Sequence, residues 1–389
     1  MTTETVGSRP VWWRDVGTLR IVAQVVAVAA AFAFLGYLYR NLVTNLRAQG
    51  IGTGFEFLAR PAGVNVAGSG FEASQPVRSV ILLGVKNTLA LVIVGVPVLT
   101  VVGVVVGIAR LSSNWLVRKA ASVYVETLRN IPPLLVILIA FNAVLLPLPT
   151  IDNALHPLGV LVVSNRELGV PWLVPREGSG LYLLVLTVAL VLAAGIWVWR
   201  TRRFDSTGAP HHRVLWSSAF LVGVGIGAYF LIGTPFQVSL PEVRDRIVVG
   251  GMAARASYVA VLVALAMYTA SHVAEITRGS ILAVPKGQTE AANALALTRF
   301  QRLRFVVLPQ AFRIAIPPMI NQFLNFTKNT SLGIAVGYAE VTLVTFQAIG
   351  NGYPAPQMIL ILMGVYLVFS LTISALVNIL NRRLQFVTR

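Results

Sequence analysis

The feature that most constrains this chain is a series of apolar runs, each about 20 residues long and nearly free of charge. A helical run of this length spans the hydrocarbon core of a bilayer, because an α-helix rises about 1.5 Å per residue and the core is about 30 Å thick. Only 12% of the residues are charged, against about 25% in a typical soluble domain. The sequence therefore predicts an all-α, polytopic helical membrane protein.

Eight such runs can be separated, and each predicts one membrane-spanning helix. They lie at about residues 18–39, 78–109, 120–146, 181–199, 214–232, 256–276, 314–346 and 356–380. The first is too long for the apolar part of a signal sequence and is followed by further spans, so we expect it to be retained. The seventh is the least regular, because Pro317, Pro318 and Lys328 interrupt it.

The distribution of basic residues predicts the orientation. If the N-terminus lies inside, the inner segments hold 19 of the 31 Lys and Arg residues and the outer segments hold 9. Basic residues collect on the cytoplasmic side of membrane proteins, so both termini are predicted to be cytoplasmic. The same rule accounts for the net charge of +17, and nucleic acid is not expected as a partner. The long outer segments, about residues 40–77, 147–180 and 233–255, are rich in Gly and Pro, which fits both ordered loops and simple connectors.

The residue types argue against chemistry on this chain. There is no cysteine, and the four histidines have no metal-ligand spacing, so we expect no metal site and no catalytic residue. No G-x-x-x-x-G-K-[ST] stretch is present to cradle a nucleotide triphosphate. Any active transport must then be driven by an ion gradient or by hydrolysis on a separate protein.

A segment between the sixth and seventh runs, "TEAANALALTRFQRLRFVVLPQA" (289–311), has a pattern that a simple connector does not need. Pro285 precedes a short predicted helix over Lys286–Leu297, whose surface is flattened by several alanines. Thr298 and Gln301 have the spacing of a capping box, which predicts a second short helix ending before Pro309. Two interpretations fit this helix-turn-helix equally: a docking element for another protein, or an interfacial helix on anionic lipid.

Ionisable and polar residues within the spans are candidates for function. Glu126 and Arg129 lie three residues apart on one helix face, and their simplest interpretation is a mutual ion pair. Asn130 and Pro132 follow, where a broken helix would expose backbone to a pathway. Glu275 is predicted to pair with Arg278.

Two further groups lie on other spans. Lys328, with Asn329, Thr330 and Ser331 beside it, could meet a substrate carboxylate or pack against an acid of a neighbouring helix. Asn87 and Thr88 either line the pathway or hold helices together, and the second interpretation is favoured.

The segment at 289–311 resembles the signature loop of membrane subunits of bacterial ATP-binding-cassette importers. That loop has the order E-A-A, three residues, G, nine residues, I, one residue, L-P. Glu290-Ala291-Ala292 and the pair at 308–309, Leu-Pro, keep the family spacing, with Val306 at the isoleucine position. The chain departs from the pattern at Ala296, where the family usually has glycine.

Other stretches resemble the amino-acid importer branch, the histidine/glutamine permease subfamily. They are "KNTLAL" (86–91), "RLSSNWLVRKAASVYVETLRNIPPLLV" (110–136), "EITRGSILAVPKGQTEAANALAL" (275–297) and "TKNTSLGIAVGY" (327–338). "RNLVTNLRAQGIGTGFEFLARPAG" (40–63) is similar to a loop in the first of the two paired permeases of general L-amino acid importers. The resemblance implies an N-terminal span and loop at 1–77, a five-span permease core at 78–148 and 252–389, and an insertion with two spans at 149–251. The coupling loop of the core covers 278–312.

The resemblance also implies partners and roles. They are a second permease in a heterodimer, two ATPase subunits that hold ATP and Mg, and an extracytoplasmic amino-acid-binding protein, in the plasma membrane of a bacterium. The coupling residues would be Gly287, Glu290, Ala291, Ala292, Ala296, Leu308 and Pro309. Candidates for the substrate pathway are Lys328, Asn329, Thr330, Asn87, Thr88, Glu126, Arg129 and Asn130. The alternatives are an ion-coupled secondary amino-acid transporter, which predicts inverted repeats that are not seen here, and a membrane enzyme.

Overall fold

The computed structural model describes residues 16–48, 50, 52, 54–66, 70–208 and 212–384. Arg9 and Arg14, which were counted among the inner basic residues, lie outside the described residues. The chain divides into two compact units. Unit 1 contains the residues up to Lys86 together with Val341–Val368, and unit 2 contains Asn87–Glu340 and the residues from Phe369 onward.

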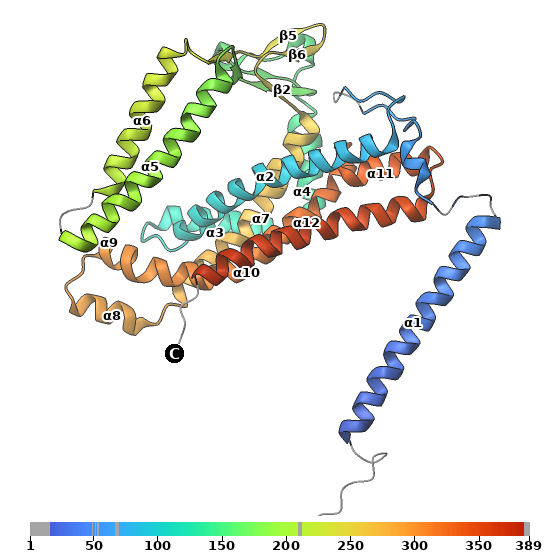
Figure 1. The fold of residues 1–389 in the computed structure, drawn as a ribbon, viewed down its shortest axis with the longest axis horizontal. Coiled ribbons are helices and arrows are strands. Elements are labelled where there is room, and N and C mark those ends of the chain that lie inside the picture. Colours follow the sequence, from blue (N-terminus) through green and yellow to red (C-terminus); the bar gives the residue numbers. More distant parts are fainter. Residues whose placement is uncertain are drawn as a thin grey trace, which may run out of the picture. The chain divides into compact units, whose positions relative to one another are not determined.

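The prediction of a polytopic helical membrane protein is confirmed. Seven helical segments in the described part of the chain are long and apolar enough to cross a membrane, and the number is eight if one bent pair counts as a span (Figure 1). The seven are α1 (Val16–Ala48), α2 (Val77–Ala109), α5 (Ser179–Thr207), α6 (Arg213–Leu231), α7 (Ala256–Leu282), the run from Arg299 to Val336 that contains α10 (Leu308–Asn329), and α12 (Ala355–Leu384).

The third predicted span is a bent pair and not one straight helix. It consists of α3 (Trp115–Arg129), followed by α4 (Pro133–Ile139) and η2 (Ala140–Leu145), with a bend of 107° between the two parts. Two prolines explain the break, because Pro132 and Pro133 lack the backbone N–H that would continue the helix. The bend leaves α3 lying across the direction of α4.

The seventh predicted span was wrong at its C-terminal end. Pro317 and Pro318 lie inside α10 without ending it, and the chain then tightens into the 3₁₀-helix η6 (Thr330–Val336). Gly337 stops this helix in a left-handed conformation (φ 68°), and the separate helix α11 (Val341–Gly350) follows. Glycine permits this stop because it has no Cβ to clash at positive φ.

The core of unit 2 is built on α7. Of the 18 residues in its apolar stretch, 56% are buried, against 22% or less in the corresponding stretches of the other six candidate helices. Its buried face carries many small residues, which lets neighbouring backbones come close. A Cβ added to Gly103 of α2 would stand 2.6 Å from Cβ of Val273 on α7. One added to Gly107 would stand 2.6 Å from the carbonyl oxygen of Ala274. α7 also packs against α3, α4 and α10.

Unit 1 joins the loop after α1 to the segment around α11. The loop contains the 3₁₀-helix η1 (Glu56–Ala59). Gln357 donates a hydrogen bond to the carbonyl of Gly52 (2.8 Å), and the hydroxyl of Tyr353 donates to the carbonyl of Pro61. The loop is therefore an ordered element fixed by side chains from the C-terminal part of the chain.

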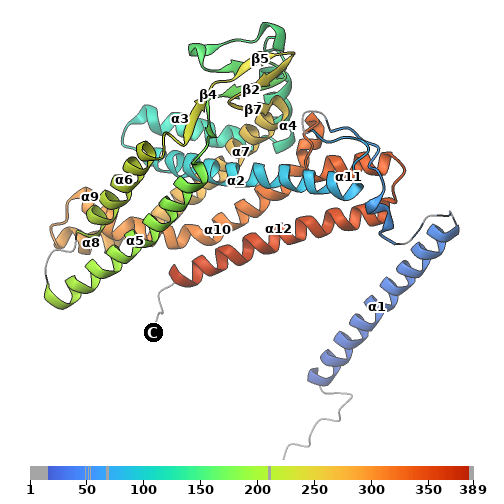
Figure 2. The same cartoon turned by 45° about the horizontal axis from the view of Figure 1, so that its top comes forward.

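The insertion contains a helical hairpin, α5 and α6, and small antiparallel sheets that the sequence did not predict (Figures 1 and 2). The strands are β1 (Val162–Val163), β2 (Glu167–Val170), β3 (Trp172–Pro175), β4 (Phe236–Ser239), β5 (Glu242–Arg244), β6 (Ile247–Val249) and β7 (Met252–Arg255). The sheets have the orders β1-β2-β7, β3-β4 and β5-β6. Two short 3₁₀-helices, η3 (Ile151–Asn153) and η4 (Pro157–Gly159), precede them. The segments at 147–180 and 233–255, which were predicted to lie outside, are thus ordered and pair with each other.

Candidate coupling and translocation site

The predicted loop helix is present as α8 (Lys286–Ala294), which begins after Pro285. Ala292 faces inward and is buried (3% exposed), whereas Gly287, Glu290 and Ala291 are exposed. A Cβ added to Gly287 would meet nothing within 4 Å. Glu290 makes no ion pair with any residue that the structure describes. The exposed side of α8 thus offers small residues around one unpaired acid.

Ala296 ends this helix in a left-handed conformation, with φ at 54°. The amide of Leu297 donates to the carbonyl of Ala292 (3.1 Å), and the amide of Ala296 donates to the carbonyl of Asn293 (2.9 Å). This is a Schellman motif, in which the left-handed position is usually glycine. The motif explains why the resembling family has glycine at this position, and here an alanine makes the same turn with strain of about 1 kcal/mol.

The second half of the loop starts as predicted and ends differently. Thr298 and Gln301 form the capping box: the amide of Gln301 donates to the Thr298 hydroxyl (3.3 Å), and the Gln301 side chain accepts from the Thr298 amide (2.9 Å). The predicted end before Pro309 was wrong. α9 (Arg299–Arg302) passes through the π-helical turn η5 (Leu303–Val307) directly into α10. Pro309 is the second residue of α10, and because the helix continues into it from η5, its missing N–H removes one bond at this junction.

Two side-chain bonds hold α8 against the returning segment. Arg302 donates to the side chain of Asn293, and Gln310 donates to that of Gln288 (3.2 Å). Leu308 is half-buried and lines an apolar pocket beside Ile108. Three large apolar side chains of the loop are exposed: Leu295 by 76%, Phe300 by 67% and Phe305 by 63%. An ordered loop with this much exposed apolar surface is suited to a contact with lipid or with another protein.

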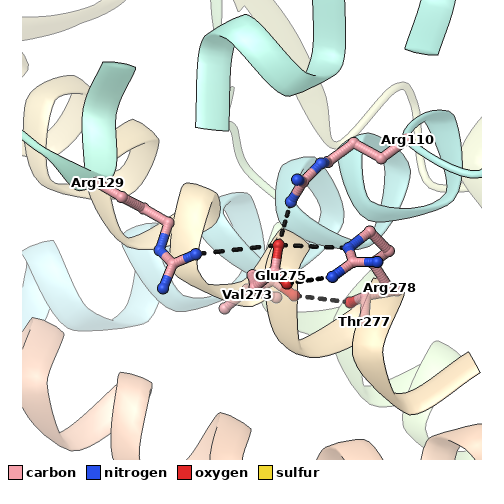
Figure 3. Close-up of polar contacts among 6 residues, drawn as sticks. All are labelled: Arg110, Arg129, Val273, Glu275, Thr277 and Arg278. Carbon is pink, nitrogen blue, oxygen red and sulfur yellow. Dashed lines mark hydrogen bonds and ion pairs between the residues drawn. The ribbon is translucent and has the colours of Figure 1, made fainter. Parts of the chain in front are cut away.

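A cluster of charges lies at the end of α7 that leads into this loop (Figure 3). Glu275 accepts hydrogen bonds from Arg110, which directly follows α2, and from Arg278 (2.6 Å). Arg129, the last residue of α3, places a guanidinium nitrogen 3.9 Å from the same carboxylate. We call Glu275, Arg110, Arg129 and Arg278 the Glu275 cluster. It joins the ends of α2 and α3 to α7.

The predicted pairing of Glu275 with Arg278 is confirmed, and the predicted pair of Glu126 with Arg129 is wrong. Arg129 turns to Glu275 (Figure 3), and Glu126 is exposed without an ion pair among the described residues. The physical reason is the number of cations around Glu275, since a carboxylate held by three guanidinium groups is stabilised more than an exposed pair on one helix. Asn130 caps α3 at the bend and is exposed.

The candidates on α10 and η6 lie near each other in sequence but differ in exposure. Lys328 is exposed and forms no ion pair with an acid in the described part of the chain. Asn329 is half-buried. Thr330 is fully buried, and its hydroxyl donates to the carbonyl of Thr327 (2.7 Å). Of these three, Lys328 is therefore the most accessible to a ligand, and the hydroxyl of Thr330 is not accessible.

Asn87 bridges α2 and the turn after η6. Its side-chain amide donates to the carbonyl of Ala339 (2.7 Å), and its own carbonyl accepts from the hydroxyl of Tyr338 (2.9 Å). Thr88 beside it is fully buried. These contacts are of the kind that holds segments together.

Two residues of this region were missed at the level of sequence. Arg110 supplies a bond to Glu275 from a position 165 residues away, and no local spacing reveals it. Glu340 is fully buried at the turn before α11. A signal for Glu340 was available, because it is the only acidic residue after Glu290.

In the insertion, charged side chains connect the small sheets and the segments beside them. Glu167, which is 9% exposed, accepts a hydrogen bond from the amide of Val248 (3.1 Å) and links β2 to β6. Arg246 forms an ion pair with Asp152 (2.9 Å), and the hydrogen bond to this carboxylate raises the pKa of Arg246. Burial lowers the pKa of Arg255, an effect that the nearby charge of Glu167 opposes. These contacts connect the two sheet-forming segments of the insertion.

Comparison with known proteins places these features in a family. The sequence profile of the "Binding-protein-dependent transport system inner membrane component" family matches residues 99–386. The permease protein YhdX of Escherichia coli (strain K12) is 37% identical over 371 residues, covering 94% of this chain and 94% of YhdX. The general L-amino acid transport system permease protein AapQ of Rhizobium johnstonii is 35% identical, covering 95% of this chain and 93% of AapQ. The glutamate/glutamine/aspartate/asparagine transport system permease protein BztB of Rhodobacter capsulatus is 34% identical, covering 95% and 94%.

Proposed function

This chain belongs to the family of binding-protein-dependent transport system inner membrane components, and from that premise we propose that it is a permease subunit of an ATP-driven amino-acid importer. The observation that carries the proposal is the likeness over 95% of this chain to permeases whose names specify amino-acid transport. The same likeness argues against an ion-coupled secondary transporter. On this proposal the chain performs no hydrolysis, and ATP and Mg are bound by a partner.

The coupling role is assigned to α8. An ATPase must grip a rigid, exposed element, and α8 is fixed at its start by Pro285 and at its end by the Schellman turn. Glu290 and Ala291 face outward, Gly287 leaves open space above the backbone, and Leu295 and Phe300 add apolar surface. Such a surface suits a close protein contact, in which Glu290 would meet a basic group of the ATPase. Ala292 and Leu308 pack inward and would support the loop.

The remaining partners follow from the same proposal. A second permease subunit would complete the pathway as a heterodimer, two ATPase subunits would bind the coupling loops, and an extracytoplasmic binding protein would deliver the amino acid. The two-to-one excess of basic residues supports an orientation with both termini in the cytoplasm. The ordered surface around Glu167 and Arg246 would then face the binding protein.

Within the pathway, Lys328 is proposed to meet the carboxylate of the amino acid, because it is exposed and without an ion pair among the described residues. Asn329, and Asn130 at the bend of α3, are proposed as polar neighbours of the pathway. Asn87 and Thr88 are proposed to hold the helices around it.

The test is Glu290→Ala in the complete transporter, reconstituted with its ATPase and binding protein. We expect the variant to lose ATPase during purification and to lose ATP-dependent uptake, while its thermal stability stays at the wild-type value because Glu290 has no partner within the described chain. Asp205→Ala is the matched control, since Asp205 is another exposed acid predicted on the same side. If Glu290→Ala retains both ATPase and uptake at the level of Asp205→Ala, the coupling role of α8 is refuted.

A further inference from the structure

The α5–α6 hairpin contains a groove that the proposed function does not use. It has a volume of about 440 Å³ and lies between the two helices. Leu190 and Ala193 of α5 and Val214 and Leu221 of α6 line it, and its wall is almost wholly apolar. Both helices are long and apolar enough to cross a membrane, so the groove lies at the depth of lipid chains.

One polar atom in the groove lacks a partner. Ser217 is 9% exposed and lines the groove, yet its hydroxyl makes no hydrogen bond within the described structure. Buried hydroxyl groups in proteins are nearly always hydrogen-bonded, and an exception requires an explanation such as a missing ligand. A lipid ester or phosphate oxygen near the end of the groove would supply an acceptor.

Three arginines stack on tryptophans where the groove ends. The guanidinium carbon of Arg213 lies 4.9 Å from the ring centre of Trp197, which itself lines the groove. Arg200 lies over Trp216 (5.4 Å) and Arg203 over Trp199 (5.7 Å). This end of the hairpin lies at the left edge of Figure 1, above α8. Arg213 donates from one guanidinium nitrogen to the hydroxyl of Thr201 (3.2 Å). Because the guanidinium stacks through its face, its other N–H groups remain available to bind a phosphate.

The charge balance of this helix end favours an anion. Asp205 is the single acid in the two helices, against Arg200, Arg202, Arg203 and Arg213. Arg203 and Arg213 form no ion pair with any acid in the part of the chain that the structure describes. Arg213 is also the first residue of α6, where the helix dipole disfavours a cation. An anion beside Arg213 would offset its unfavourable position at the start of α6.

We propose that the α5–α6 hairpin binds one anionic phospholipid, with its phosphate at Arg213 and an acyl chain in the groove beside Ser217. Basic pockets between membrane helices bind anionic headgroups in this way, and tryptophan prefers the level of the headgroups. A free phosphate ion has no acyl chain to occupy the groove, so the groove distinguishes a phospholipid from inorganic phosphate. The proposal depends on the hairpin alone and not on the transported substrate.

The experiment is native mass spectrometry of the purified transporter complex, titrated with phosphatidylglycerol or with phosphatidylcholine of the same chain length. We expect the wild-type protein to retain one phosphatidylglycerol per copy of this chain and to bind phosphatidylcholine more weakly. Arg213→Gln should weaken phosphatidylglycerol binding about fivefold, the ratio that corresponds to about 1 kcal/mol per basic residue at an anionic surface. Ser217→Leu, which fills the groove, should weaken binding without changing the charge.

Arg202→Gln is the matched control, because Arg202 is exposed at the same helix end but stacks on no ring within the described structure. Equal losses for Arg202→Gln and Arg213→Gln would overturn the proposal in favour of a diffuse basic surface. Equal retention of the two lipids would overturn it as well. Displacement of the bound lipid by inorganic phosphate would show a site for a free anion. If Arg213→Gln does not purify as an intact complex, Ser217→Leu carries the same test.

Discussion

Replacing Glu275 by glutamine removes the one negative charge of the Glu275 cluster while keeping the size of the side chain. The carboxylate accepts bonds from Arg110 and Arg278, whose side chains are 13% and 31% exposed, and lies 3.9 Å from a nitrogen of Arg129. A hydrogen bond between charged groups contributes about 1.5–3 kcal/mol. The side chain of Glu275 is 27% exposed, so solvent screens part of the interaction energy. The two bonds together should contribute about 3 kcal/mol to the free energy of unfolding. Three arginines that repel each other would remain.

The measurement is thermal unfolding of the reconstituted protein, with single and paired variants of the cluster. A loss of about 3 kcal/mol should lower the Tm by roughly 3–6 °C in a chain of this size. A double-mutant cycle of Glu275→Gln with Arg110→Gln should give a coupling of about 1.5–3 kcal/mol. The cycle with Arg129→Gln should give about 1 kcal/mol or less, because Arg129 is 42% exposed and more distant. The reasoning is refuted if the coupling to Arg129 equals that to Arg110, or if Glu275→Gln unfolds at the wild-type Tm.

Three further substitutions test individual features. Ala296→Gly should stabilise the loop by about 1 kcal/mol, because glycine adopts the positive φ of this position without strain. Hydrogen exchange of the α8 amides should then be slower, and unchanged exchange would show that the turn is not strained. Gly103→Ala should lower the free energy of unfolding by about 1–3 kcal/mol, because the added Cβ would overlap Val273. Its Tm should be lower than that of Gly287→Ala, whose added Cβ meets open space. Asn87→Leu should cost about 1–3 kcal/mol by leaving the carbonyl of Ala339 without its bond, and a Tm equal to wild type would exclude a structural role for that bond.

Much of the helical architecture could be predicted because apolar length alone decides membrane spans. The limits of α2 were placed within one residue, since the run is bounded by polar loops on both sides. The break in the third span was indicated by Pro132, and the bend of 107° confirms it. The end of the seventh span was misplaced because apolar residues continue on both sides of the stop at Gly337. The strands of the insertion are two to four residues long and are fixed by pairing across distant segments, so no local periodicity revealed them.

The contacts of the charged residues could likewise be predicted from the sequence only where both partners lie close together in the chain. Spacing predicted the partner of Glu275 correctly in Arg278, because both are three residues apart on one helix. The same spacing gave the wrong partner for Arg129, because its real partner lies on α7 and only the packing of α3 against α7 brings them together. The capping box at Thr298 was predictable for the opposite reason, as all of its atoms belong to four consecutive residues. Local geometry is visible in a sequence, and the choice between competing partners is decided by tertiary packing.

The position of the Glu275 cluster gives it a mechanical consequence. α8 is separated from α7 only by the short link at 283–285, and Glu275 lies roughly two helical turns before the end of α7. The cluster ties the end of α7 to the ends of α2 and α3. A force applied to α8 is therefore expected to reach all three helices together and not to bend α7 alone. Breaking the bond to Arg110 should leave α8 bound to its partner but lower the number of transport cycles per ATP, whereas Glu290→Ala should lower binding itself. The two variants thus separate attachment of the loop from transmission of the force.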